Sequence, residues 1–195
     1  MLNFCFRKSR FLVSPFAAVV LFTTPPTYSA RADGLAFLPL LDMTVARLHI
    51  ARQVALSKWD SQKPVEDLLR EAQVIKAAAE EARAFGVSTK FATDFFTDQI
   101  EANKLVQYGL LAKWHRVGHA PDEKRVDLAK DIRPELDGLQ QGFIKTLADT
   151  TALRAQPNCN AQLARATQDY VTSRKLNSLY AIAMDRALAR FCEKD

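Results

Sequence analysis

Apolar and polar residues follow each other along most of the chain with the period of an α-helix. Between about residues 38 and 58, apolar side chains recur three and four positions apart, as at Leu41, Val45 and Leu48. Most of the remaining chain is rich in Ala, Leu, Gln, Glu, Lys and Arg, which are good helix formers. No stretch shows the sustained alternation of Val, Ile and Thr that indicates a strand. The pattern therefore predicts an all-α fold.

Sparse glycine and proline residues divide this pattern into segments, with no linker, repeat or change of composition between them. Pro64 suits the first position of a helix, and Gly86 suits a helix end. Pro134 either kinks a long helix or opens a new one, and Asn158 is a suitable N-cap. We expect one domain of five or six helices, at about residues 38–58, 64–85, 89–115, 126–153, 158–170 and 175–192.

The first 32 residues have the order of features found in a secretory signal peptide. Basic residues (Arg7, Lys8 and Arg10) precede an apolar run at 11–22, and Ala30-Arg31-Ala32 matches the small-x-small pattern of a cleavage site. The apolar run is about twelve residues long, whereas a membrane-spanning helix needs about 20. We therefore expect a cleaved signal at 1–32, a mature domain at 33–195 and a periplasmic or secreted protein without a stable membrane anchor. An uncleaved anchor or a disordered tail is the alternative.

The basic character of the chain belongs largely to this leader. The sequence has 27 Lys and Arg residues against 22 Asp and Glu, and residues 1–32 contain four of the basic residues and no acidic one. The mature part then keeps 23 basic against 22 acidic side chains, a net charge near +1. A nucleic-acid-binding domain usually keeps a basic stripe, so we expect no nucleic-acid partner.

Cysteine usage agrees with export. Cys5 lies in the leader, and Cys159 and Cys192 remain in the mature chain. An even number of cysteines in an oxidising compartment favours a disulfide. We therefore predict that Cys159 pairs with Cys192; two buried free thiols are the alternative.

Several polar residues are spaced so that they share helix faces. Arg47 and Lys58 are eleven residues apart, which offsets them by only about 20° around a helix. Later segments repeat such groupings at spacings of three and four residues: Asp67, Arg70 and Glu71, then Asn103 and Gln107. Each grouping alone is typical of a solvated surface. Their succession along three consecutive helices indicates a common site.

This succession resembles the all-helical chorismate mutases of the AroQ type. The similarity rests on three stretches and extends over about residues 38–192: Arg47-x10-Lys58-Trp59, Pro64-Val65-Glu66-Asp67-Leu68-Leu69-Arg70-Glu71, and Phe96-x-Asp98-Gln99-Ile100-x-Ala102-Asn103-x3-Gln107-Tyr108. The leader, the single helical domain and the cysteine pair resemble the secreted, gamma subclass of that family.

The resemblance implies an isomerase that rearranges chorismate to prephenate in aromatic amino acid biosynthesis, as a homodimer with each site inside one protomer. The reaction is pericyclic and implies no cofactor or metal. His115 and His119 are four residues apart, but no third ligand follows at the spacing of a zinc site. The alternative function is an inactive periplasmic helical interaction protein on the same scaffold.

The resemblance also implies roles for individual residues. Arg47 binds a substrate carboxylate, and Lys58 bridges a carboxylate and the ether oxygen. Gln107 is the second donor to that oxygen; as an amide it donates at any pH, whereas a Glu must first be protonated. Arg133 is the further arginine that binds the substrate carboxylates together with Arg47. Arg125 is the alternative, because the loop before Arg133 varies in length and the alignment with the family is not fixed there.

The remaining implied roles concern the ring of the substrate. Glu71 and the backbone of Asp67 hold the ring hydroxyl, and Arg70 lines the pocket and stabilises the developing charge. Asn103 lies at the ring carboxylate, where relatives tend to have Ser or Thr. The expected catalytic set is therefore Arg47, Lys58, Arg70, Glu71 and Gln107.

Overall fold

The computed structural model describes residues 34–193, so the expected signal peptide lies outside the described residues. Within this range the chain is helical and contains no strand, which confirms the all-α prediction. The elements are α2 (Leu38–Ser61), α3 (Leu68–Ala84), α4 (Thr89–Val117), η1 (Leu128–Ile132), α5 (Arg133–Asp149), α6 (Thr151–Arg154), α7 (Cys159–Ser173) and α8 (Ser178–Leu188). None of the helices described here is both long and apolar enough to span a bilayer.

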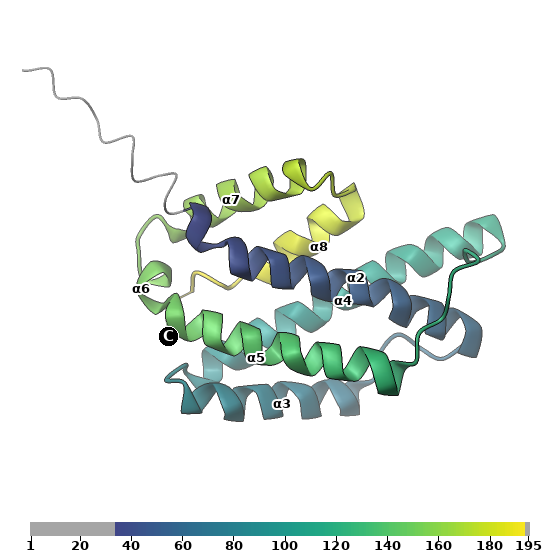
Figure 1. Ribbon diagram of the computed structural model, residues 1–195, viewed down its shortest axis with the longest axis horizontal. Helices are drawn as coiled ribbons and strands as arrows, with labels where there is room; N and C mark the ends of the chain where they lie inside the picture. The colour runs from purple at the N-terminus through teal and green to yellow at the C-terminus, as the bar shows by residue number, and fades with distance from the viewer. Residues whose placement is uncertain (1–33, 194–195) are drawn as a thin grey trace, which may run out of the picture.

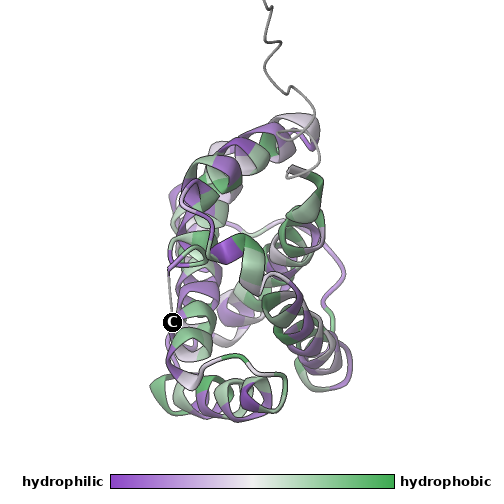
Figure 2. Cartoon of the chain, turned by 90° about the vertical axis from the view of Figure 1, so that its left-hand side faces the viewer, coloured by the Kyte–Doolittle hydropathy of each residue, from purple (hydrophilic) through white to green (hydrophobic). Residues whose placement is uncertain are grey.

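The long helix α4 lies at the centre of the molecule. Helices α2, α3 and α8 pack directly on it, and α5 packs across α2 and α3 (Figure 1). Figure 2 looks approximately along α2, α3 and α5, and each helix carries both hydrophobic and hydrophilic residues. The apolar side chains of each amphipathic helix are removed from water by its neighbours, which is the main stabilising contribution in such a bundle.

An aromatic cluster joins the centre of the bundle to its C-terminal end. The ring of Phe95 lies 5.4 Å from those of Phe96 and Phe143 and 6.5 Å from that of Phe191, measured between centroids. These rings are almost fully buried, and most pairs meet edge to face, the preferred geometry of aromatic pairs. Phe95 and Phe96 therefore belong to the hydrophobic core.

Capping groups decide where α3 begins, and the expected start at Pro64 is wrong. Asp67 Oδ1 accepts a hydrogen bond of 3.1 Å from the backbone N–H of Arg70, and Glu71 Oε1 accepts one of 3.1 Å from the N–H of Asp67. These bonds satisfy N–H groups that have no partner inside the helix, so the helix begins at Leu68. Its expected end is confirmed, since Gly86 has a φ of +76°.

The expected fourth helix is interrupted. A π-helical segment at Leu128–Ile132 precedes α5, whose first turn contains Pro134, and α6 follows as a separate short turn. Proline is accepted in a first turn because the N–H it lacks would have no helical partner there. The last helix is shorter than expected and begins at Ser178, because Asn177 Oδ1 accepts from the N–H groups of Leu179 and Tyr180.

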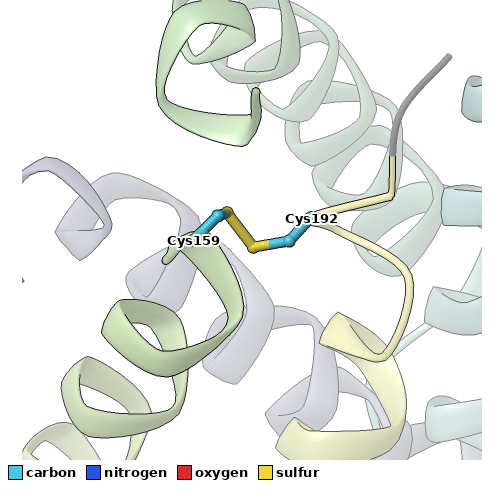
Figure 3. Close-up of a disulfide and its surroundings, with 2 residues drawn as sticks. All are labelled: Cys159 and Cys192. Carbon is cyan, nitrogen blue, oxygen red and sulfur yellow. A yellow bond between two sulfur atoms is a disulfide. The ribbon is translucent and has the colours of Figure 1, made fainter. Parts of the chain in front are cut away.

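The predicted disulfide is confirmed. Cys159 at the start of α7 bonds to Cys192 beyond the end of α8, with a Cα–Cα distance of 5.8 Å (Figure 3). The bond closes a segment with a sequence separation of 33. In the chain-entropy model a loop of this length stabilises the fold by about 3–4 kcal/mol.

Candidate active site

A cavity of about 280 Å³ lies among α2, α3, α4, η1 and α5. Its lining contains every site residue predicted from the sequence: Arg47, Lys58, Asp67, Arg70, Glu71, Asn103, Gln107 and Arg133. The helical spacings explain this convergence. Arg47, Val54 and Lys58 recur along one face of α2, and Ile100 and Gln107 do so along α4.

Arg47 is a buried cation without a counter-ion among the described residues. Arg47 is only 7% exposed, and its Nε has no hydrogen-bond partner. Burial lowers the pKa of its guanidinium to about 10, and no carboxylate offsets this effect. A buried guanidinium that lines a cavity and has no carboxylate partner is suited to bind an anion that enters the cavity.

Asn103 links Arg47 to Gln107 through its amide. Its Nδ2 donates to the backbone carbonyl oxygen of Arg47 at 3.0 Å, and its Oδ1 accepts from Nε2 of Gln107 at 2.8 Å. The backbone bond determines which end of the Asn103 amide faces Gln107, and therefore which end of Gln107 faces Asn103. Nε2 of Gln107 keeps a second N–H for another acceptor.

Glu71 is held from two sides. Oε1 accepts from the backbone N–H of Asp67 at 3.1 Å, and Oε2 accepts from Nζ of Lys104 at 3.1 Å. The N–H and the carboxylate that were expected to bind one hydroxyl are therefore direct neighbours at the N-terminus of α3.

Three further cations face the cavity. Lys58 is half-buried, and Arg70 and Arg133 are exposed at its edge. None of the three forms an ion pair with a carboxylate of residues 34–193. Their charges therefore remain available to a ligand.

Arg133 and Arg125 have different surroundings in the structure. Arg133 lines the cavity, whereas Arg125 pairs with Asp60 at 2.8 Å and donates to the carbonyl oxygens of Pro121 and Glu123. These contacts hold the loop before η1 against the end of α2. Arg133 therefore faces the cavity, and Arg125 does not.

Sequence reasoning missed Lys104, Asp137 and Gln140, which also line the cavity. Lys104 carried a usable signal, because it lies four residues after Ile100 and three before Gln107 and therefore shares their helix face. Asp137 and Gln140 carried none, because their position depends on how α5 packs against α3.

The charges of the lining suit a dianion. Five cationic side chains and three carboxylates line the cavity, which leaves two positive charges in excess. Apolar walls, including Val54, Ile100 and Ile132, shield these charges from water and strengthen their interactions. Within residues 34–193, no group of three or more His, Cys, Asp or Glu side chains is arranged to hold a metal ion. The arrangement can bind a small dianion and direct hydrogen-bond donors at it.

Comparison with known proteins identifies the family. Residues 39–108, which include seven of the eight predicted site residues, match the family model described as chorismate mutase type II. The secreted chorismate mutase of Mycobacterium tuberculosis is 34% identical over 165 residues, covering 84% of this chain and 82% of that protein. The crystal structure of a chorismate mutase from Burkholderia phymatum superimposes with a TM-score of 0.81 at 45% identity, covering 84% of this chain and 99% of that one. A chorismate mutase from Burkholderia thailandensis gives a TM-score of 0.76 at 38% identity, over 80% and 99% of the two chains. The cation-lined cavity and these similarities agree, and the chain belongs to the chorismate mutase family.

Proposed function

We propose that the protein converts chorismate to prephenate in this cavity without a cofactor. The observation that carries the proposal is Arg47, a buried guanidinium without a counter-ion among the described residues, in a cavity with two excess positive charges. Chorismate carries two carboxylates, so its charge matches this excess. A buried cation is costly by itself, and a bound anion offsets that cost.

The reaction needs positioning and electrostatic stabilisation rather than a nucleophile. The ether C–O bond breaks as a C–C bond forms in the same step, and the ether oxygen gains negative charge in the transition state. Holding the substrate in its compact conformer removes part of the entropic barrier. Fixed donors at the ether oxygen stabilise the developing charge, and each is worth about 3–4 kcal/mol in comparable sites.

Lys58 and Gln107 are the proposed donors to the ether oxygen. Both line the cavity, and Gln107 is buried and held by Asn103 at 2.8 Å. Arg47 on α2 and Arg133 on α5 are the proposed partners of the two substrate carboxylates.

The other proposed roles follow from hydrogen bonds on α3 and α4. Glu71 and the N–H of Asp67 are the proposed partners of the ring hydroxyl, which accepts from this N–H and donates to the carboxylate in place of the bond between them. Arg70 adds positive charge at the edge of the cavity. Asn103 was expected at the ring carboxylate, but its amide already bonds to Arg47 and Gln107. We therefore assign to Asn103 the orientation of Gln107 as its main role.

A direct assay tests the proposed activity. Purified protein mixed with chorismate should cause its ultraviolet absorbance to fall at a rate proportional to protein concentration. A rate equal to that of the uncatalysed reaction would overturn the proposal and favour the inactive interaction protein.

The amide at Gln107 predicts a flat pH profile. Because a neutral amide donates in every protonation state, kcat/KM should vary by less than about threefold between about pH 5 and about pH 7.5. The matched variant Gln107→Glu should be most active at the acidic end and lose activity as the pH rises, because a carboxylate cannot donate to the ether oxygen. Initial rates across this range measure both profiles. A steep loss of activity with pH in the unmodified protein would contradict the assignment of Gln107.

We also propose that the protein is exported, as a homodimeric member of the gamma subclass. The support is the leader at 1–32, the disulfide between Cys159 and Cys192, and the name of the mycobacterial relative, a secreted chorismate mutase. The mass of the protein recovered outside the cytoplasm should correspond to a chain that begins at Asp33. Full-length protein confined to the cytoplasm would contradict export.

A further inference from the structure

Lys104 is a buried lysine that lines the cavity and has no role in the proposed chemistry. The residue lies on α4 with 9% of its side chain exposed. Its Nζ is 3.1 Å from Oε2 of Glu71, 2.7 Å from Oε1 of Glu101 and 3.8 Å from Oε1 of Glu66. One ammonium group is thus surrounded by three carboxylates from the loop before α3, from α3 and from α4.

These three carboxylates differ in what they face. Only Glu71 lines the cavity, and its side chain is 18% exposed, whereas those of Glu66 and Glu101 are 53% and 39% exposed. The two oxygens of Glu71 are held separately, one by Lys104 and the other by the backbone N–H of Asp67. Together these bonds determine the plane and direction of the Glu71 carboxylate.

Lys104 also changes the charge that a ligand meets. Glu71 is one of three carboxylates in a cavity suited to a dianion, and a like charge at this position repels such a ligand. The ammonium of Lys104 offsets that charge at 3.1 Å. Burial lowers the pKa of Lys104, but hydrogen bonds to Glu101 and Glu71 outweigh this effect, so the pKa lies above its usual value and the group stays charged.

We infer that Lys104 is a positioning residue for the mutase reaction: it directs the Glu71 carboxylate at the substrate and cancels its repulsion of the dianion. The inference rests on the proposed role of Glu71. The competing explanation is purely structural, with Lys104 serving only to tie α3 to α4 through an ion-pair network.

Lys104→Met tests the inference, because Met retains much of the side-chain length and removes the charge. The variant should show KM raised by about tenfold or more, the size expected when a hydrogen bond to a charged group is lost. In the Glu71→Gln background, Lys104→Met should have little further effect on KM, because the carboxylate through which Lys104 acts is then gone. A purely structural role predicts the same rise in KM in both backgrounds, so a tenfold rise on adding Lys104→Met to Glu71→Gln would overturn the inference.

Two further variants keep the test decisive if Lys104→Met folds poorly. Glu101→Gln removes the carboxylate nearest to the Lys104 ammonium and keeps the ion pair between Lys104 and Glu71. This variant should leave kcat and KM near those of the unmodified protein. A loss comparable to that of Lys104→Met would favour the structural role and contradict ours. Lys104→Arg keeps the charge and should keep KM within about threefold; a tenfold rise would also contradict the inference.

Glu71→Gln alone separates this inference from the proposed function. If Glu71→Gln leaves kcat/KM unchanged, the role proposed for Glu71 fails, and the inference about Lys104 fails with it. If Glu71→Gln lowers kcat/KM and Lys104→Met does not raise KM, only the inference about Lys104 fails. Circular dichroism and thermal unfolding of each variant establish that the helical fold is intact.

Discussion

Replacing Arg47 by Met is expected to lower kcat/KM about 1,000-fold, the loss typical of a charge-assisted donor in a buried site, and to raise the thermal stability of the protein. Both effects have one cause. Arg47 is 7% exposed, its Nε has no hydrogen-bond partner, and no carboxylate of the described residues pairs with it. The group therefore binds anions strongly and destabilises the protein when none is bound. Steady-state kinetics and thermal unfolding without substrate measure the two effects.

The size and pH dependence of the stability gain follow from the pKa of Arg47. Burial lowers this pKa well below its usual value, to about 10. A pKa shift of this size corresponds to a free-energy cost of roughly 3 kcal/mol for the charged group in the folded state. If Arg47→Met recovers part of this cost, the midpoint of thermal unfolding should rise by roughly 5 °C in a domain of this length. The charged guanidinium destabilises the folded protein fully below about pH 10, and this destabilisation decreases as the pH rises above about 10, because the folded state releases the proton before the unfolded state does. Between about pH 6 and about pH 8 the gain should therefore not depend on pH.

The control for Arg47→Met is Arg116→Met, which removes an exposed cation in the last turn of α4 that does not line the cavity. This control should keep kcat/KM and should not gain stability. An Arg47→Met protein that unfolds at a lower temperature than the unmodified protein would contradict the view that Arg47 is a strained, uncompensated charge.

Replacing Lys58 by Met is expected to lower kcat by about 100- to 1,000-fold, the range found when one donor to a developing negative charge is removed. Lys58 lies eleven residues after Arg47 on the same face of α2, lines the cavity and has no ion-pair partner among the described residues. The ether oxygen carries most of its negative charge in the transition state, so the effect on KM should be smaller than the effect on kcat.

Lys63→Met is the matched control for Lys58→Met, because Lys63 is exposed in the loop after α2 and does not line the main cavity. It should leave kcat and KM unchanged. If Lys58→Met instead raises KM and leaves kcat intact, Lys58 binds the ground state and is not a donor to the ether oxygen.

Helical periodicity alone determined much of the candidate site. Arg47 and Lys58 share a face of α2 because eleven residues make slightly more than three full turns. Asp67 and Glu71, and likewise Asn103 and Gln107, lie one turn apart for the same reason. Local spacing was sufficient in these cases because a regular helix fixes the direction of every side chain from its sequence position.

Local chemistry outside regular helices was less informative. Both Pro64 and Asp67 are suitable near the start of α3, and the choice depended on the hydrogen bonds that the carboxylates of Asp67 and Glu71 accept from backbone N–H groups. Likewise, Pro134 allowed either a kink or a new helix, and the chain forms a π-helical segment followed by a new helix.

Only the tertiary structure decided how far each candidate is buried and what pairs with it. Arg133 rather than Arg125 faces the cavity because Arg125 is bound to Asp60 across 65 residues of sequence. Arg47 lacks a counter-ion among the described residues, and Lys104 has three carboxylates around it, although each is a buried cation on a long helix of the bundle. Their different states arise from groups on neighbouring helices. The sequence by itself therefore determined which side chains share a face, and the packing of those faces determined their charge environment, because electrostatic interactions depend on distance through space and on burial.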